Sequence, residues 1–143
     1  MAEAIGGKSS IHTIERNENM IKLAEENISI SPYGDRIKII EGEAEEILSN
    51  LDYIYDFIFL DAAKGQYLEF FNLSIKLLKP EGLLVCDNVL FRGMVATDSL
   101  VVRRKKTIVK RLRSFLKYIN DIEGYTSCIM PLGDGVAIIY KES

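Results

Sequence analysis

Two short apolar runs, each ending in polar side chains, constrain the fold of this chain more than any other feature. The first run, residues 55–61, ends in an aspartate, and the second, residues 82–88, ends in an aspartate and an asparagine. Such short runs with abrupt ends are typical of buried parallel strands. The segment between them, residues 66–78, has apolar side chains at helical spacing. The pattern therefore predicts a strand–helix–strand unit.

The polar ends of the two predicted strands are expected to lie together. A right-handed crossover puts both strand ends on one edge of the sheet, where open α/β sheets bind their ligands. Asp61, Asp87 and Asn88 would then converge on one site, and their hard oxygen donors suit Mg²⁺, or a similar cation such as Mn²⁺ or Ca²⁺. The alternative for either aspartate alone is a helix N-terminal cap. The pair, with Asn88 beside the second, favours a metal.

The rest of the chain repeats the alternation and then closes with an antiparallel pair. Asn17 can cap a helix after the first strand, and an Asp-Gly turn in residues 131–135 joins the last two strands. The sequence thus predicts an α/β fold of Rossmann-like type with a C-terminal hairpin, as one domain over residues 1–143. The predicted strands are residues 11–15, 37–41, 55–60, 82–86, 124–130 and 136–140.

The start of the chain predicts an incomplete sheet. Residues 2–5 look like the end of a helix stopped by two glycines, and no strand precedes them. We therefore expect an opening strand and its turn to be missing.

Other strand ends also carry candidate residues. Glu15 would lie at the same edge of the sheet, where an acid can accept hydrogen bonds from ribose hydroxyls; it can equally be an exposed strand-end carboxylate. Residues 42–44 can let the backbone approach an adenine, or can simply begin a helix. Lys64 can act as a base or orient an anion near a metal, although most lysines are solvated surface groups.

Charge is unevenly distributed along the chain. The formal net charge is −3, which does not indicate a polycation, yet seven of the 18 basic residues lie between residues 103 and 113. This basic segment can contact phosphates. The alternative is the solvated face of an amphipathic helix.

Composition points to a reducing compartment and away from a membrane. Cys86 and Cys128 lie in apolar, strand-like runs and form no metal or redox spacing, so we expect two buried free thiols. The sequence has no signal-peptide pattern and no apolar run long enough to span a bilayer. A cytoplasmic protein is the expectation.

Five motifs follow one another along the chain: Thr13-Ile14-Glu15-Arg16-Asn17, Glu41-Gly42-Glu43-Ala44, Phe59-Leu60-Asp61-Ala62-Ala63-Lys64-Gly65-Gln66-Tyr67, Asp87-Asn88-Val89-Leu90 and Gly133-Asp134-Gly135. Together they resemble the cation-dependent O-methyltransferases, the family of catechol and caffeoyl-CoA O-methyltransferases and their bacterial relatives. Among these the chain is most similar to the bacterial tRNA 5-hydroxyuridine methyltransferases. The resemblance covers residues 11–140.

The resemblance implies a class I fold that binds S-adenosylmethionine (SAM) and a divalent metal, with a homodimer as the expected assembly. It implies that Asp61, Asp87 and Asn88 bind the metal. Lys64 and Asp61 are implied as catalytic, with Lys64 as the base. The residues implied for the cofactor are Glu15, Arg16, Gly42, Glu43, Ala44 and Asp61. The family's first strand and its Gly-rich turn, which meets SAM, have no counterpart in these residues.

Three hypotheses about function follow. The first is a Mg²⁺- and SAM-dependent O-methyltransferase acting on 5-hydroxyuridine in tRNA, with RNA-contacting residues Arg92, Arg103, Arg104, Lys105 and Lys106. The second is a methyltransferase of small catechol-like or phenolic molecules. The third is an inactive truncated fold that acts as a binding or partner module.

Overall fold

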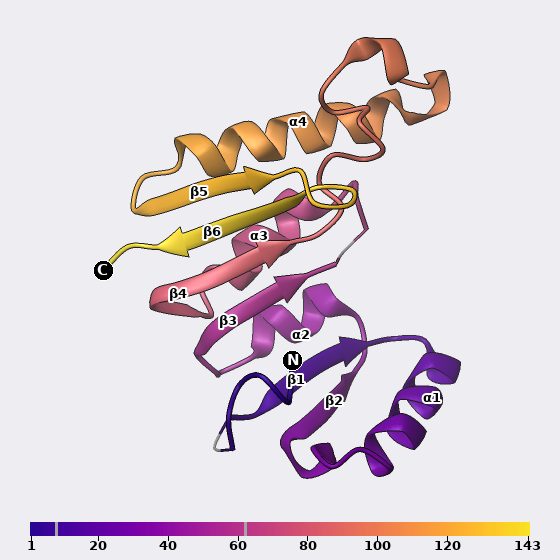
Figure 1. Ribbon diagram of the computed structural model, residues 1–143, viewed down its shortest axis with the longest axis vertical. Coiled ribbons are helices and arrows are strands. Elements are labelled where there is room, and N and C mark those ends of the chain that lie inside the picture. Colours follow the sequence, from indigo (N-terminus) through magenta and orange to yellow (C-terminus); the bar gives the residue numbers. More distant parts are fainter. Residues whose placement is uncertain (8, 62) are drawn as a thin grey trace. The chain divides into compact units, whose positions relative to one another are not determined.

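The computed structural model describes residues 1–7, 9–61 and 63–143, and the chain forms two compact units, Met1–Leu51 and Asp52–Ser143 (Figure 1). Both units combine parallel strands with helices, as the sequence predicts. All six predicted strands are present, with small shifts at their ends. The α/β class, with a C-terminal antiparallel hairpin, is therefore confirmed. The single domain predicted from chain length stays a prediction.

The first unit is a small βαβ arrangement. Strand β1 (Ile11–Glu15) pairs in parallel with β2 (Ile37–Glu41), so that Glu15 lies opposite Glu41. Helix α1 (Glu18–Ser29) connects them through a short 3₁₀ turn (Gly34–Arg36), and α2 (Ala44–Asn50) follows β2. The parallel pairing puts the ends of β1 and β2 side by side.

The start of α1 is fixed by a predicted cap. The side-chain oxygen of Asn17 accepts hydrogen bonds from the backbone N–H groups of Asn19 and Met20, at 3.0 and 3.2 Å. These bonds satisfy two of the donors that a helix N-terminus leaves unpaired. The cap therefore orients the helix directly after the carboxylate that ends β1.

The second unit is a four-stranded mixed sheet with the strand order β3-β4-β6-β5. Strand β3 (Tyr55–Leu60) pairs in parallel with β4 (Leu78–Cys86), and β6 (Val136–Lys141) runs antiparallel to both β4 and β5 (Tyr125–Met130). Helix α3 (Tyr67–Ser74) forms the crossover from β3 to β4. Between β4 and β5 lie two 3₁₀ turns, Asp98–Leu100 and Arg103–Lys105, and helix α4 (Lys106–Asp121).

The core of the second unit lies between one face of this sheet and helices α3 and α4. The ring of Phe71 on α3 contacts those of Phe115 and Tyr118 on α4, with centroids 5.8 and 6.0 Å apart. Leu84 and Ile139 of the sheet are fully buried beneath them. This packing holds α3 and α4 against the sheet.

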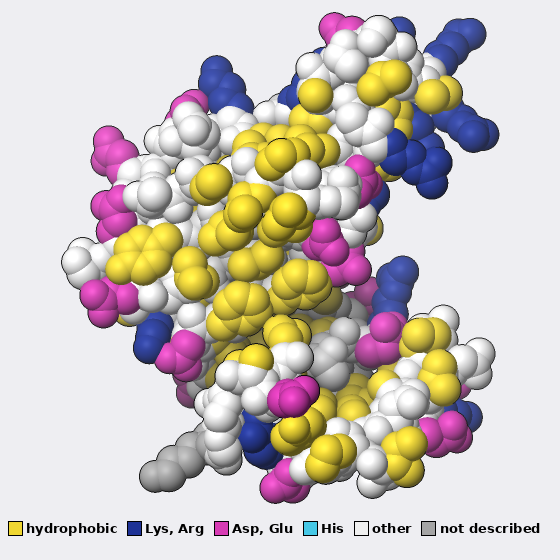
Figure 2. Space-filling view, viewed as in Figure 1, with side chains coloured by type: hydrophobic (Ala, Val, Ile, Leu, Met, Phe, Trp, Pro, Cys, Tyr) yellow, Lys and Arg dark blue, Asp and Glu magenta, His cyan; other side chains and the backbone are white. Residues whose placement is uncertain are grey.

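The opposite face of the same sheet is apolar and half exposed. Phe57 and Phe59 of β3 are 42% and 46% exposed, and Leu83 and Tyr140 on neighbouring strands are also exposed. Figure 2 shows hydrophobic side chains gathered over β3, β4 and β6. Within the described part of this unit, the helices that pack on the sheet lie on the other face.

Three local expectations are wrong. Residues 2–5 form turns and no helix. Leu78, predicted on the crossover helix, begins β4, because Pro80 disfavours helix in the residue before it. Cys128 is exposed because β5 lies at the edge of the sheet, whereas Cys86 is fully buried, as predicted.

No helix in the described ranges is both long and apolar enough to cross a membrane.

Candidate functional site

The ends of β3 and β4 bring three predicted residues together. Leu60 and Cys86 are paired in the parallel ladder, and the backbone N–H of Asp87 donates to the carbonyl oxygen of Leu60 at 3.0 Å. One strand therefore continues into Asp61 and the other into Asp87 and Asn88 at the same edge. The expectation that the two strand ends meet is borne out.

The side chains of Asp61 and Asn88 lie next to each other. The amide nitrogen Nδ2 of Asn88 donates to Oδ1 of Asp61 at 3.5 Å. Asn88 has a φ of 58°, which is uncommon for a residue other than glycine. The turn is held partly by Asp87, whose Oδ1 accepts a hydrogen bond from the backbone N–H of Asn88 at 2.7 Å.

These three residues fit a hard divalent cation by their chemistry. Two carboxylates and an amide supply oxygen ligands only, and rotating the Asn88 amide by half a turn would present its oxygen toward Asp61. Among the described residues, no group of three or more His, Cys, Asp or Glu side chains is arranged to hold a metal. A metal would thus depend on two acids, the amide and oxygens from outside the chain.

Tyr67, for which no role was predicted, stabilises this turn through a hydrogen bond. Its hydroxyl donates to the backbone carbonyl oxygen of Asp87, and its side chain is buried at the start of α3. Burial raises the pKa of the Tyr67 hydroxyl well above its usual value, and the negative charges of neighbouring groups, including Asp61 and Asp87, raise it further. The hydroxyl therefore stays protonated and keeps donating.

A hollow of about 620 Å³ opens beside Asn88. Its apolar lining consists of Phe91, Met94, Leu100 and Val102. Its polar lining consists of four cations, Lys64, Arg92, Arg104 and Lys105, together with Asn88 and Asp134. The ammonium groups of Lys64 and Lys105 lie 5.7 and 5.8 Å from the ring centroid of Phe91. An aromatic wall between cations suits a flat ligand that carries negative charge.

The predicted RNA-contacting residues divide between two places. Arg92, Arg104 and Lys105 line this hollow. Lys106 lines a second hollow, beside Lys110 and Arg113, and Arg103 lines neither. Because the residues in the two hollows are different, single substitutions can separate a role in the first hollow from a role in the wider basic segment.

Five of the six residues predicted for the cofactor lie in the first unit, and the sixth, Asp61, lies in the second. Oε1 of Glu15 accepts hydrogen bonds from the backbone N–H groups of Arg16 and Asn17, at 2.9 and 2.8 Å. The guanidinium of Arg16 pairs with the carboxylate of Glu43 at 3.0 Å, and both side chains are largely exposed. This pairing joins the ends of β1 and β2, although exposed pairs of this kind stabilise little.

Gly42 and Ala44 complete that group. The backbone N–H of Gly42 donates to the carbonyl oxygen of Glu15 at 3.0 Å, and Gly42 has a φ of 137°, which favours glycine. Ala44 begins α2. The expected helix start after β2 is present. Within the described residues, the oxygen Oε2 of Glu15 has no hydrogen bond, unlike Oε1.

Sequence reasoning missed Tyr67, Phe91 and Asp134 as parts of this region. Tyr67 and Asp134 lie inside motifs that carry the resemblance, but nothing in their spacing indicates a contact with the ends of β4. Phe91 has no pattern of its own, because it lies in an irregular segment. Ala62, which belongs to the motif around Asp61, lies outside the described residues.

Comparison with known proteins decides the family. A family model described as O-methyltransferase matches residues 1–142. The chain belongs to the O-methyltransferase family. It is 30% identical to caffeoyl-CoA O-methyltransferase 1 of Eucalyptus globulus, over 99% of this chain and 61% of that protein. The match therefore extends over nearly all of the present chain.

Two solved structures have the same fold as this chain. A Staphylococcus aureus protein solved as a candidate caffeoyl-CoA O-methyltransferase is 39% identical, with a TM-score of 0.83 over 92% of this chain and 64% of that one. The methyltransferase PaMTH1 of Podospora anserina, solved with S-adenosylhomocysteine (SAH) bound, is 28% identical, with a TM-score of 0.82 over 94% of this chain and 61% of that one. The fold is therefore the Rossmann-like fold of SAM-dependent methyltransferases. The chain spans less than two thirds of each of these relatives.

Proposed function

We propose that this chain is a SAM- and divalent-metal-dependent O-methyltransferase that methylates a hydroxyl group on an aromatic ring beside a second oxygen. The observation that carries the proposal is the contact of Asp61 with Asn88 at the ends of two parallel strands, next to a hollow with an aromatic wall and cations. A ring with two adjacent oxygens can chelate a cation held there while its body lies in the hollow. Family membership supports methyl transfer from SAM.

In this proposal Asp61, Asp87 and Asn88 hold the metal. A divalent cation bound there would lower the pKa of a hydroxyl group that it contacts. Lys64 lines the hollow and is the proposed base that takes the hydroxyl proton; its alternative role is to orient a negatively charged group of the acceptor. In methyl transfer an oxygen–carbon bond forms while the sulfonium sulfur–carbon bond of SAM breaks, which leaves SAH.

The proposed cofactor contacts are those of the resemblance. Glu15 would accept hydrogen bonds from the ribose hydroxyls through its second carboxylate oxygen, Oε2. Gly42, Glu43 and Ala44 would meet the adenine, with Arg16 holding Glu43 in place. The resemblance also implies a cofactor contact for Asp61, which directly follows β3.

For the acceptor, a small hydroxylated aromatic molecule with an anionic group is the first candidate. The Eucalyptus globulus relative is named caffeoyl-CoA O-methyltransferase 1, and caffeoyl-CoA is a phenolic ring joined to a phosphate-bearing carrier. A hollow of about 620 Å³ is within the usual range for small-molecule sites. Lys64, Arg92 and Lys105 are placed to attract the negative charge.

The second candidate is 5-hydroxyuridine in tRNA, which also has a hydroxyl beside a second oxygen. The observation that favours it is the basic segment, which extends beyond the hollow to Arg103 and Lys106. A long polyanion can use cations outside the hollow, whereas a small acceptor cannot.

Metal binding tests the site independently of the acceptor. Titration with MnCl₂, followed by electron paramagnetic resonance, should show a site in the wild type that Asp61→Asn and Asp87→Asn both lose. Glu69→Gln, which changes an exposed carboxylate on α3, should retain it. Equal Mn²⁺ binding by all four proteins would overturn the proposed metal site.

Methyl transfer from radiolabelled SAM tests the two acceptors side by side. Caffeoyl-CoA and tRNA containing 5-hydroxyuridine are offered separately, with Mg²⁺ present. If tRNA is the acceptor, the double variant Arg103→Ala, Lys106→Ala should methylate tRNA more slowly than the wild type does. Any methylation of caffeoyl-CoA should be unchanged in this variant. Methylation of caffeoyl-CoA alone would exclude the second candidate.

Calorimetry with SAM distinguishes an enzyme from a partner module. Heat of binding that disappears in Glu15→Gln supports the proposed cofactor contact. No heat at saturating SAM would favour the inactive fold.

A homodimer, which the resemblance alone suggests, is tested by sedimentation equilibrium.

A further inference from the structure

The segment Val89–Leu100, here called the wall loop, supplies four of the residues that line the hollow. These residues are Phe91, Arg92, Met94 and Leu100. The wall loop is irregular apart from one 3₁₀ turn at its end. Its shape, and therefore the shape of the hollow, must depend on contacts with neighbouring elements.

The entry of the wall loop is tied to the hairpin turn. The backbone N–H groups of Val89 and Leu90 donate to the carbonyl oxygens of Gly135 and Asp134, at 3.0 and 2.8 Å. The carboxylate of Asp134 also accepts a hydrogen bond from the backbone N–H of Arg92. These bonds fix the first four residues of the loop.

Two of these four residues have a strained backbone. Phe91 and Arg92 have φ values of 48° and 55°, in the left-handed region that residues other than glycine rarely adopt. Such conformations persist only where the surroundings hold them in place. The bonds to the hairpin turn hold the loop as far as Arg92. The part of the loop after Arg92 therefore needs a second anchor.

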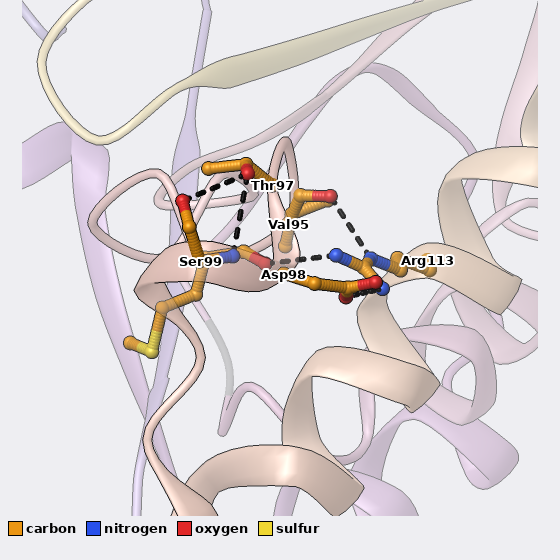
Figure 3. A network of polar contacts seen from close by, with 6 residues as sticks. Val95, Thr97, Asp98, Ser99 and Arg113 are labelled. Atoms are coloured by element: carbon orange, nitrogen blue, oxygen red, sulfur yellow. Dashed lines mark hydrogen bonds and ion pairs between the residues drawn. The ribbon is translucent and has the colours of Figure 1, made fainter.

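Arg113 on α4 provides that anchor (Figure 3). Its Nε donates to the carbonyl oxygen of Val95 at 2.9 Å, and its Nη2 donates to that of Met94 at 3.2 Å. Its Nη1 pairs with Oδ1 of Asp98 at 2.7 Å. One guanidinium thus binds three points of the wall loop, in the forked geometry that only arginine offers.

The far end of the loop is shaped by its own side chains. Thr97 caps the 3₁₀ turn Asp98–Leu100, because its Oγ1 accepts a hydrogen bond from the backbone N–H of Ser99 at 3.3 Å. This cap orients Asp98 toward Arg113. The two carbonyl contacts of Arg113 lie between Arg92 and Leu100, which both line the hollow.

We propose that Arg113 is a positioning residue that fixes the wall loop to α4 and so holds the acceptor-binding wall, Phe91 and Arg92 above all, in its binding conformation. The inference rests on the proposed function as far as the acceptor is concerned. Arg113 lines the second hollow and is absent from the first, so it acts on the acceptor through the loop. The loop contacts themselves do not depend on the reaction.

The test uses Arg113→Ala, Arg113→Lys and, as a matched control on the same helix, Lys117→Ala. The control removes an exposed cation that forms no hydrogen bond or ion pair with the described residues of the wall loop. Kinetics with the acceptor that the wild type methylates should show an acceptor KM raised about tenfold or more in Arg113→Ala, since bonds from a charged donor are lost. The KM for SAM should stay unchanged, and Arg113→Lys should lie between, because an ammonium cannot bind three acceptors at once.

Hydrogen exchange provides a readout that does not need activity. The backbone N–H groups of Met94, Val95, Ala96 and Thr97 are hydrogen-bonded within the loop. Their exchange should become about tenfold faster in Arg113→Ala and stay at the wild-type rate in Lys117→Ala. Asp98→Asn removes only the ion pair and should give a smaller increase in exchange rate than Arg113→Ala. If Arg113→Ala does not fold, the increase in Asp98→Asn relative to the wild type is the test.

Two outcomes would overturn the inference. The first is unchanged exchange of the loop amides in Arg113→Ala and Asp98→Asn. The second is faster exchange without any change in the acceptor KM. If the wild type methylates neither acceptor, the proposed function has failed, and the anchoring role is then judged by the exchange rates alone.

Discussion

The hydroxyl of Tyr67 donates a hydrogen bond to the backbone carbonyl oxygen of Asp87, directly below the turn that presents Asn88 to Asp61. The donor belongs to the crossover helix, and the acceptor directly follows the strand after that helix. The same βαβ unit therefore builds the candidate site and supports it from within. Its stability and its geometry are consequently linked.

Tyr67→Phe should lower the free energy of unfolding by about 1–3 kcal/mol, because it leaves a partly buried carbonyl oxygen without its donor. The change keeps the ring, so packing against Phe115 is preserved. Urea denaturation at neutral pH measures the loss. Tyr140→Phe removes a hydroxyl from a side chain that is 37% exposed and should change stability by less than about 0.5 kcal/mol. Equal losses in the two variants would show that the Tyr67 bond contributes nothing.

Sequence reasoning could predict the meeting of Asp61 with Asn88 because the right-handed crossover leaves little choice. Short apolar runs that end in polar residues determine where parallel strands stop, and the edge then follows. The contact of Tyr67 with Asp87 could not be predicted. It depends on how closely α3 approaches β4, which packing of complete side chains decides.

The end of the crossover shows a different limit. Helical spacing included Leu78 in a helix, but the strand begins at that residue, and Glu81 takes a φ of 62° before the regular ladder resumes. Periodicity cannot place such a break, although Pro80 marks it in retrospect. The wall loop lacks any periodicity, so the role of Phe91 emerges only from the structure. The same holds for the contact of Asp134, in the hairpin turn, with this loop.

The buried thiol of Cys86 should make stability fall at alkaline pH. Burial raises the pKa of this thiol to about 12, from an ordinary value of 9.0. Between these values the unfolded chain has lost the proton and the folded chain keeps it, so the folded state binds more protons. Stability therefore decreases as pH rises through this window, by at most about 1.4 kcal/mol per pH unit from this group.

Urea denaturation from pH 8 to 10.5 measures that slope. Cys86→Ala should flatten the dependence relative to the wild type, even though the cavity lowers stability at every pH. Cys128→Ala, which changes an exposed thiol, is the matched control and should keep the wild-type slope.

A disulfide reagent should correspondingly modify Cys128 in the folded protein and Cys86 only after unfolding. Rapid modification of both thiols would contradict the burial of Cys86.

The two faces of the second unit's sheet should respond differently to the loss of a phenylalanine. Phe71→Ala should cost about 3–5 kcal/mol, because this fully buried ring joins α3 to α4. Phe59→Ala should cost less than about 1.5 kcal/mol, because that ring is 46% exposed on the open face. Urea denaturation of both variants gives the comparison. A loss in Phe59→Ala as large as that in Phe71→Ala would mean that the open face is covered in solution.

The hairpin turn offers a test of the entry anchor of the wall loop. Gly133 and Gly135 both have positive φ values, 56° and 85°, so an alanine at either position suffers a similar backbone strain of about 1–2 kcal/mol. Only at Gly135 would an added Cβ also collide with Leu90, whose Cδ1 and Cβ lie 2.7 and 2.8 Å away; at Gly133 it would meet no described atom within 4 Å.

Gly135→Ala should therefore destabilise the protein by about 1–3 kcal/mol more than Gly133→Ala, the cost of inserting a methyl group where packing is already tight. Because Leu90 is the second residue of the wall loop, the collision should also displace the loop and accelerate exchange of the Arg92 amide, which Asp134 holds. Gly133→Ala should leave that amide protected. Urea denaturation and hydrogen exchange of the two variants measure these effects. If Gly135→Ala lost stability without faster exchange at Arg92, the hairpin would not control the loop, and the strain at Phe91 and Arg92 would have to be held by Arg113 alone.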